Sequence, residues 1–149
     1  MNEVKSIAES EKEIIEDFSL FDSWDEKYEY IIELGKKLPL LNPVYRTDDH
    51  IVKGCQSTVW LGSSFRDGKV FYEADSDAII VKGLISLLIR ILSGHRPDEI
   101  IQAQLECIKV IGMASHLAQT RANGLLAMVK QMKNDALAYQ LQNQLNQAE

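Results

Sequence analysis

Apolar residues recur at helical intervals in the first part of the chain. From about Val4 to Phe21 they fall three, four or seven residues apart, as in an amphipathic helix, at Ile7, Ile14, Ile15, Phe18 and Phe21. The stretch Ser23-Trp24-Asp25-Glu26 then has the form of a capping box, in which a serine oxygen accepts from the N3 amide and a glutamate reaches back. A second helix is therefore predicted, and Pro39 ends it because proline cannot continue a helix.

The pattern changes to strict alternation between residues 57 and 75. Apolar residues occupy alternate positions on both sides of Asp67-Gly68, a dipeptide that favours a tight hairpin turn. They are Val59, Leu61 and Phe65 before the turn and Val70, Tyr72 and Ala74 after it. A hairpin alone is marginally stable, so a third strand or a helix is needed against it. The stretch around residue 55 could supply that strand.

The most apolar stretch of the chain follows at once, from Ala78 to Leu92. Ser76 and Asp77 offer side-chain oxygens for its N-cap. Its strongly polar residues fall four apart, at Lys82, Ser86 and Arg90. One narrow polar stripe predicts a helix that is buried on its other sides, and the run is too short and too charged to cross a bilayer. We expect it to be the central core helix, packed on the hairpin.

The remaining segments are less regular. Residues 40–53 have no clear periodicity and are predicted to form a loop. A short helix is expected to begin at Pro97, and residues 105–117 are expected to be helical in part. A last helix opens near Thr120, and its polar tail of residues 137–149, rich in glutamine and asparagine, is predicted to fray from Tyr139 onward. The patterns together predict an α+β fold in which a small antiparallel sheet, of about three strands, packs against a helical layer.

Composition and charge narrow the possible functions. With 149 residues and 46% hydrophobic content, one domain over residues 1–149 can bury a core without metal or disulfide support. Acids outnumber bases by 22 to 16, and a net charge of -6 has the wrong sign for binding phosphates, so nucleic acid is not an expected partner. Half of the acids lie between Glu3 and Glu33, and a solvated helix surface is the simplest interpretation.

The chain has two cysteines, Cys55 and Cys107, and neither belongs to a CxxC or zinc-binding spacing. A disulfide framework is excluded. The chain opens without a basic region followed by an apolar stretch, so we expect no signal peptide and a reducing, cytoplasmic location. No membrane partner is expected. Cys107 lies among apolar residues and is interpreted as a small core residue.

Cys55 is the candidate for chemistry. It follows Gly54, which can adopt a sharply turned backbone, so we expect the thiol at the tip of a movable loop. The thiolate is the reactive species, and a cation or a helix N-terminus can lower its pKa. Lys53 is close in sequence, and Asp77 could face the same loop.

Three kinds of chemistry are open to this thiol. A redox couple would need a second nearby cysteine, which the spacing does not provide. Hydrolysis would need a positioned histidine, for which His50, His95 and His116 are the candidates. Carriage of a group on sulfur needs the thiol alone.

Several short sequence blocks occur along the chain in the same order as in a known protein family. The blocks are Gly54-Cys55-Gln56-Ser57 with Val59-Trp60, then Asp75-Ser76-Asp77 with Ala78 and Ile80-Val81-Lys82-Gly83-Leu84, then His116-Leu117, Arg121 and Gly124-Leu125. They are preceded by Trp24-Asp25-Glu26-Lys27-Tyr28, Tyr30-Ile31-Ile32-Glu33-Leu34-Gly35 and Leu38-Pro39. In these blocks the chain resembles the SufE family, over a core of about residues 18–133.

The resemblance implies a SufE/IscU-like fold and a non-enzymatic sulfur carrier. Such proteins stimulate a pyridoxal-phosphate cysteine desulfurase of the SufS or CsdA type, accept its persulfide sulfur, and deliver the sulfur to an iron–sulfur scaffold of the SufBCD type. Cys55 would hold the persulfide, and Gly54, Gln56, Asp77 and Arg121 would support the loop and the partner contact. No cofactor is implied for this chain, because the pyridoxal phosphate belongs to the partner. A homodimer is compatible with the resemblance.

Other interpretations stay open. Asp77 could simply cap the core helix, and Arg121 could form a surface ion pair of little energetic weight. Relatives usually have a proline where this chain has Ala118-Gln119-Thr120, so a less rigid start of the last helix is expected. An iron–sulfur scaffold is the main alternative function, but it needs several converging ligands, and only two separated cysteines are present. A cysteine-dependent hydrolase is the less favoured alternative.

Overall fold

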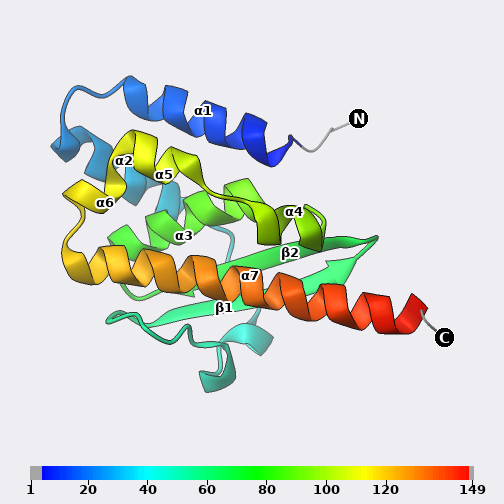
Figure 1. Cartoon of the computed structure of the whole chain (residues 1–149). Helices are drawn as coiled ribbons and strands as arrows, with labels where there is room; N and C mark the ends of the chain where they lie inside the picture. Colours follow the sequence, from blue (N-terminus) through cyan, green and yellow to red (C-terminus); the bar gives the residue numbers. More distant parts are fainter. Residues whose placement is uncertain (1–4, 148–149) are drawn as a thin grey trace.

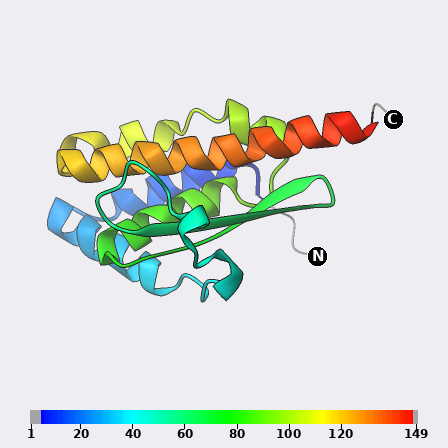
Figure 2. The ribbon, with the colours of Figure 1, turned by 90° about the horizontal axis from the view of Figure 1, so that it is seen from below.

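A computed structural model describes residues 5–147 of the chain (Figure 1). The helices are α1 (Ile7–Ser19), α2 (Trp24–Lys36), α3 (Ile79–Leu92), α4 (Pro97–Gln102), α5 (Glu106–Ile111), α6 (Met113–His116) and α7 (Gln119–Gln147), the strands are β1 (Val59–Arg66) and β2 (Lys69–Ser76), and two 3-10 turns are η1 (Pro43–Tyr45) and η2 (Asp48–His50). Helix α3 lies between α2 and the hairpin, and α7 runs along its side (Figures 1 and 2). The predicted α+β class is confirmed. Val4, the expected start of the first helix, lies outside the described residues.

The hairpin has the predicted alternation. β1 pairs with β2 antiparallel, from Val59 opposite Ser76 to Arg66 opposite Lys69. Asp67 and Gly68 have φ angles of 53° and 76°, the left-handed values that a tight hairpin turn with this dipeptide requires. Its alternate apolar residues Val59, Leu61, Val70, Tyr72 and Ala74 are buried. The hydroxyl of Tyr72 donates to the carbonyl of Met132 at 2.6 Å, which joins the hairpin to α7.

The expected third strand is wrong, because the sheet that the described residues form has two strands. Ile51 makes a single bridge to Trp60 before the chain turns away at Gly54, whose φ is 95°. The preceding loop instead covers the other side of the hairpin. A Cβ on Gly62 would lie 2.2 Å from the Tyr45 ring, so only glycine leaves room for that ring in β1.

Glycines bring α2 and α3 into backbone contact. A Cβ on Gly83 would lie 2.0 Å from the carbonyl oxygen of Ile31, and a Cβ on Gly35 would lie 2.7 Å from the amide nitrogen of Gly83. The predicted polar stripe of α3 faces its neighbours. Ser86 donates to the carbonyl of Leu34 at 3.3 Å, Lys82 pairs with Asp75 at 3.2 Å, and Arg90 pairs with Glu13 at 3.2 Å and Asp17 at 3.3 Å.

The N-terminus of α3 differs from the prediction. The helix begins at Ile79, and no side chain caps it. Ser76 accepts a hydrogen bond from the Ala78 amide at 3.2 Å, whereas Asp77 bonds elsewhere, to the backbone of Thr58. The expected capping role of Asp77 is therefore wrong.

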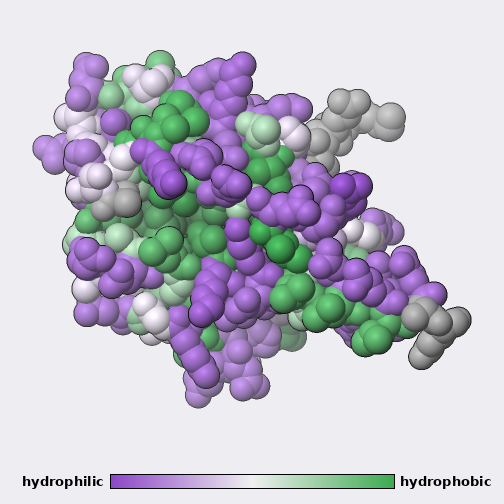
Figure 3. Space-filling model, in the orientation of Figure 1, coloured by the Kyte–Doolittle hydropathy of each residue, from purple (hydrophilic) through white to green (hydrophobic). Residues whose placement is uncertain are grey.

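The expected fraying from Tyr139 onward is wrong. Helix α7 continues without a break to Gln147, and residues 148–149 lie outside the described chain. Tyr139 stacks on Phe65 with 5.4 Å between ring centroids and donates to the carbonyl of Ser63 at 2.9 Å, so the hairpin holds this part of the helix. Apolar atoms lie along its exposed side (Figure 3).

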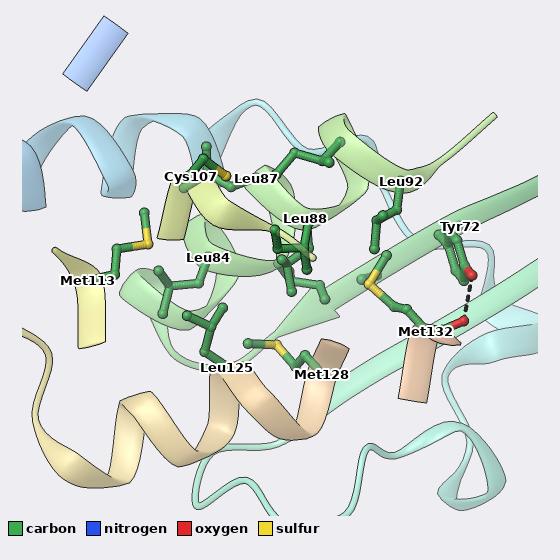
Figure 4. Close-up of a cluster of buried hydrophobic side chains, with 14 of the residues drawn as sticks. Tyr72, Leu84, Leu87, Leu88, Leu92, Cys107, Met113, Leu125, Met128 and Met132 are labelled. Carbon is green, nitrogen blue, oxygen red and sulfur yellow. Dashed lines mark hydrogen bonds between the residues drawn. The ribbon is translucent and has the colours of Figure 1, made fainter. Parts of the chain in front are cut away.

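The core lies between α3 and α7 (Figure 4). Its buried side chains include Leu84, Leu87, Leu88 and Leu92 of α3, Leu125, Met128 and Met132 of α7, and Cys107 and Met113. Cys107 is 1% exposed, which confirms its interpretation as a core residue. Within residues 5–147, every helix is too short or too polar to cross a membrane.

The glycine contact between α2 and α3 gives a stability prediction. Gly83→Ala should lower the free energy of unfolding by ~1–3 kcal/mol, because the new methyl group overlaps backbone atoms of Ile31. Gly124→Ala in α7 is the matched control, since its Cβ would make ordinary contacts at 3.5 Å or more, and removal of a helical glycine should leave stability equal or raise it by ~0.5–1 kcal/mol. Urea denaturation measures both. Equal stability of the two variants would contradict the close approach.

Candidate functional site

Backbone hydrogen bonds fix both ends of the loop that carries Cys55. At its start, the amide of Val52 donates to the carbonyl of Val59 at 2.9 Å. At its end, the amide of Thr58 donates to the Asp77 carboxylate at 3.0 Å, and the Thr58 carbonyl accepts from the Ser76 hydroxyl at 2.8 Å. The loop between them, residues 53–57, is thus a short segment held at the open end of the hairpin.

The loop turns at Gly54 and directs Cys55 toward α7. The φ of Gly54 is 95°, a value that favours glycine, and a Cβ there would lie 3.2 Å from that of Ala127. Cys55 is half-buried, and its thiol donates to the carbonyl of Gly124 with 3.6 Å between Sγ and oxygen. A Cβ on Gly124 would lie 3.5 Å from that sulfur. The helix therefore meets the thiol with backbone atoms.

Cys55 lines a pocket of about 260 Å³ between its loop, α3 and the start of α7. The pocket is lined by Cys55, Gln56, Ser57, Val81, Ala118, Thr120, Arg121, Gly124 and Met128. Arg121 is exposed, and its guanidinium makes no hydrogen bond or ion pair with any residue in the described range. The alternative interpretation of Arg121 as a surface ion pair therefore has no support in the described chain.

Burial sets the chemistry of the resting thiol. It raises the pKa of Cys55 above the ordinary cysteine value. Lys53, which could have lowered that pKa, lines separate pockets on the other side of the loop. In this position the sulfur is a protected thiol and a poor nucleophile at neutral pH. Reactivity requires the thiol to leave the pocket or a cation to approach it.

The histidines lie elsewhere. His50 bonds Thr47 at 2.9 Å, His95 is buried beside β2, and His116 stacks on Trp24 and bonds the Gly112 carbonyl. Among the described residues, Cys55 Sγ hydrogen-bonds the Gly124 carbonyl and no histidine. None of the three histidines is therefore within reach to act as its base. The hydrolase alternative therefore lacks its catalytic base.

The side chains that could bind an iron–sulfur cluster do not converge on one place in the described chain either. Between residues 5 and 147, no three His, Cys, Asp or Glu side chains are grouped to hold a metal ion. Cys107 lies in the core beside Glu11, and burial, together with that carboxylate, raises its pKa to about 12. The arrangement gives no support to the scaffold alternative, which needs several thiolates at one place.

The five residues singled out from the sequence divide into two groups. Cys55, Gln56 and Arg121 share the pocket. Gly54 and Asp77 lie outside it and shape the loop, one at its turn and the other at its end. Sequence reasoning missed the role of the Gly124 carbonyl, because a backbone acceptor leaves no sign in side-chain chemistry. The available signal was a glycine within the helix, three residues after Arg121.

Comparison with known proteins identifies the family of the chain. The model of the SufE family, described as an Fe-S metabolism associated domain, matches residues 12–136. An uncharacterized SufE-like protein of Rhizobium meliloti is 41% identical over 129 residues, which cover 83% of this chain and 92% of the relative. An uncharacterized SufE-like protein of Synechocystis is 38% identical, with 86% and 80% covered.

Two further comparisons concern a longer plant relative and a solved structure. The SufE-like protein 1, chloroplastic/mitochondrial, of Arabidopsis thaliana is 37% identical, and the match covers 91% of this chain and 38% of the plant protein. The solution structure of a hypothetical protein from Thermus thermophilus shares the fold, with a TM-score of 0.72 at 20% identity over 87% of this chain and 94% of that one. From the family match and these identities, the chain belongs to the SufE family, whose domain is associated with iron–sulfur metabolism.

Proposed function

We propose that this chain is a sulfur carrier that takes persulfide sulfur from a cysteine desulfurase of the SufS or CsdA type onto Cys55. It would stimulate that enzyme and deliver the sulfur to a SufBCD-type iron–sulfur scaffold. The observation that carries the proposal is the half-buried Cys55 thiol on a loop fixed at both ends, facing a pocket that also holds Arg121, which has no ion-pair partner among residues 5–147. Membership of a family associated with iron–sulfur metabolism supports this proposal.

The transfer needs no redox partner. The Cys55 thiolate attacks the outer sulfur of the donor persulfide, a sulfur–sulfur bond forms on Cys55, and the donor cysteine leaves as a thiolate that takes up a proton. At the acceptor, an attacking thiolate removes the outer sulfur and Cys55 leaves as a thiolate. No cofactor of this chain takes part in either step, because the pyridoxal phosphate that releases the sulfur belongs to the desulfurase.

The raised pKa of Cys55 suits a carrier that is active only with a partner. Inside the pocket the thiol is protonated, and a loaded sulfur there would be shielded from water and stray thiols. The donor must draw the loop outward, which removes the burial and lowers the pKa. Because Val52 and Thr58 are anchored, this movement is confined to residues 53–57, with Gly54 as the turning point.

Gln56 and Arg121 are the proposed partner contacts. Both are exposed at the rim of the Cys55 pocket. An unpaired guanidinium can bind a carboxylate of a partner or the negative charge of a persulfide without first breaking an internal ion pair. Asp77 acts differently in this proposal, because its carboxylate fixes the backbone of the loop through Thr58.

Sulfur acceptance can be tested by intact-mass spectrometry. After incubation with a cysteine desulfurase and L-cysteine under non-reducing conditions, the wild-type chain should gain one sulfur atom that a reductant removes. Cys55→Ser should gain none and fold as the wild type does, because the serine hydroxyl replaces a thiol of similar size. Cys107→Ala is the matched control and should still be loaded. Loading of Cys55→Ser by an active donor would refute the site.

Burial of the thiol can be tested through the pH dependence of alkylation. In the folded chain Cys55 should react slowly with iodoacetamide at neutral pH, and the rate should rise only above the pH at which an ordinary cysteine ionises, because burial raises its pKa. Cys107, with a pKa of about 12, should stay unmodified until urea unfolds the chain. Half-maximal reaction of Cys55 at or below the ordinary cysteine pKa would contradict the sheltered position.

A further inference from the structure

Three leucines are exposed along the C-terminal half of α7. Leu137, Leu141 and Leu145 are 43%, 52% and 70% exposed, and their four-residue spacing places them on one side of the helix. Figure 3 shows apolar atoms gathered along this part of the molecule. We call these three residues the leucine stripe. The SufE family match ends at residue 136, so the stripe lies beyond the segment shared with the family.

The helix presents this stripe in a fixed direction. Tyr139 packs on Phe65 and bonds the Ser63 carbonyl, which ties α7 to β1. Other residues of the same segment, Gln140, Asn143 and Gln147 among them, line a groove with the hairpin turn and the start of α4. Because one side of the helix faces the body of the protein, the leucines face solvent. The last turns run past the hairpin in both ribbon views (Figures 1 and 2).

The surroundings of the stripe favour a second copy of this chain as the partner. No charged residue occurs from Ala136 to Gln147, although the chain as a whole carries a net charge of -6. The polar residues there are glutamine and asparagine, whose amides both donate and accept hydrogen bonds, so an amide can pair with an identical amide. Two identical surfaces of this kind do not repel each other. A charged partner would find nothing complementary on it.

We propose that the leucine stripe joins two copies of the chain about a twofold axis. Leu141 would pack against its own copy, and Leu137 against Leu145 of the second copy. Residues four apart form a ridge, and two such ridges interlock at a crossing angle of about −50°, so the contact is a crossing of two helices and not a long coiled coil. The antiparallel arrangement places the two acidic bodies at opposite ends, where their charges repel least.

The size and place of the contact predict a weak dimer that leaves the thiols free. A crossing at three leucines per copy is small beside the ~1,200–2,000 Å² that stable interfaces bury, so dissociation should fall in an accessible concentration range. Leu141 lies ~26 Å along the helix from Gly124, at a rise of ~1.5 Å per residue. Both Cys55 pockets would therefore stay open, and the contact does not depend on the proposed carrier function.

Sedimentation equilibrium over a range of concentrations tests the contact. The wild-type chain should show a reversible dimer, and Leu141→Glu should be monomeric at every concentration, because it places two carboxylates at the crossing point. Leu126→Glu is the matched control: Leu126 is 67% exposed on the same helix but lies outside the stripe, so this variant should dimerise as the wild type does. A monomeric wild type, or a dimer unaffected by Leu141→Glu, would overturn the proposal.

Cysteine cross-linking tests the arrangement of the two helices. In a Cys55→Ser, Cys107→Ala background, Leu141→Cys should oxidise to a covalent dimer, since the two thiols meet across the axis. Leu137→Cys alone should stay monomeric but should link to Leu145→Cys when the two proteins are mixed. Self-linking of Leu137→Cys would refute the antiparallel arrangement. A monomeric chain whose binding to a desulfurase or to lipid vesicles is lost in Leu141→Glu would assign the stripe to that other partner instead.

Discussion

Backbone contact between α2 and α3 is the constraint on which the position of the thiol depends. Because Gly35 and Gly83 lack side chains, α2 packs directly on α3 and covers one of its sides. The hairpin and α7 must then cover the remaining sides of the most apolar helix in the chain. Their meeting point, between the open end of the hairpin and the first turns of α7, is the place where Cys55 contacts Gly124. The site is thus a consequence of how three elements surround α3.

A carrier thiol has to satisfy two opposing requirements, and the loop geometry addresses both. Burial against Gly124 keeps Cys55 protonated and shielded, which protects it but suppresses attack. Apart from the thiol contact with Gly124, the hydrogen bonds that hold the loop lie at its ends, on the backbone of Val52 and Thr58. Moving residues 53–57 outward therefore breaks little structure. A partner that binds at the rim could change the state of the sulfur at low energetic cost.

The features that were predicted correctly depend on residues close together in the chain. The hairpin follows from alternation and from Asp67-Gly68, whose left-handed dihedrals need no distant contact. The polar stripe of α3 followed from periodicity alone, and the loop position of Cys55 followed from Gly54. The wrong assignments concern partners far apart in the chain. Asp77 resembles a helix cap by position, yet it binds Thr58. The segment before Cys55 packs Tyr45 on the face of the hairpin at Gly62 and pairs with the edge of β1 through a single bridge. Neither pairing has a local signal.

The tail of α7 shows why composition misleads about helix ends. Glutamine and asparagine at the end of a chain suggest fraying, but alanine, leucine and glutamine are good helix formers, and a helix that is already formed extends by one hydrogen bond per residue. The stacking of Tyr139 on Phe65 adds tertiary support just beyond the end of the family match at residue 136. Since α7 begins at the Cys55 pocket and ends beyond the leucine stripe, one rigid element fixes both surfaces relative to each other. Any contact made at the stripe is therefore held at a fixed distance from the thiol, since Leu141 lies ~26 Å along the helix from Gly124.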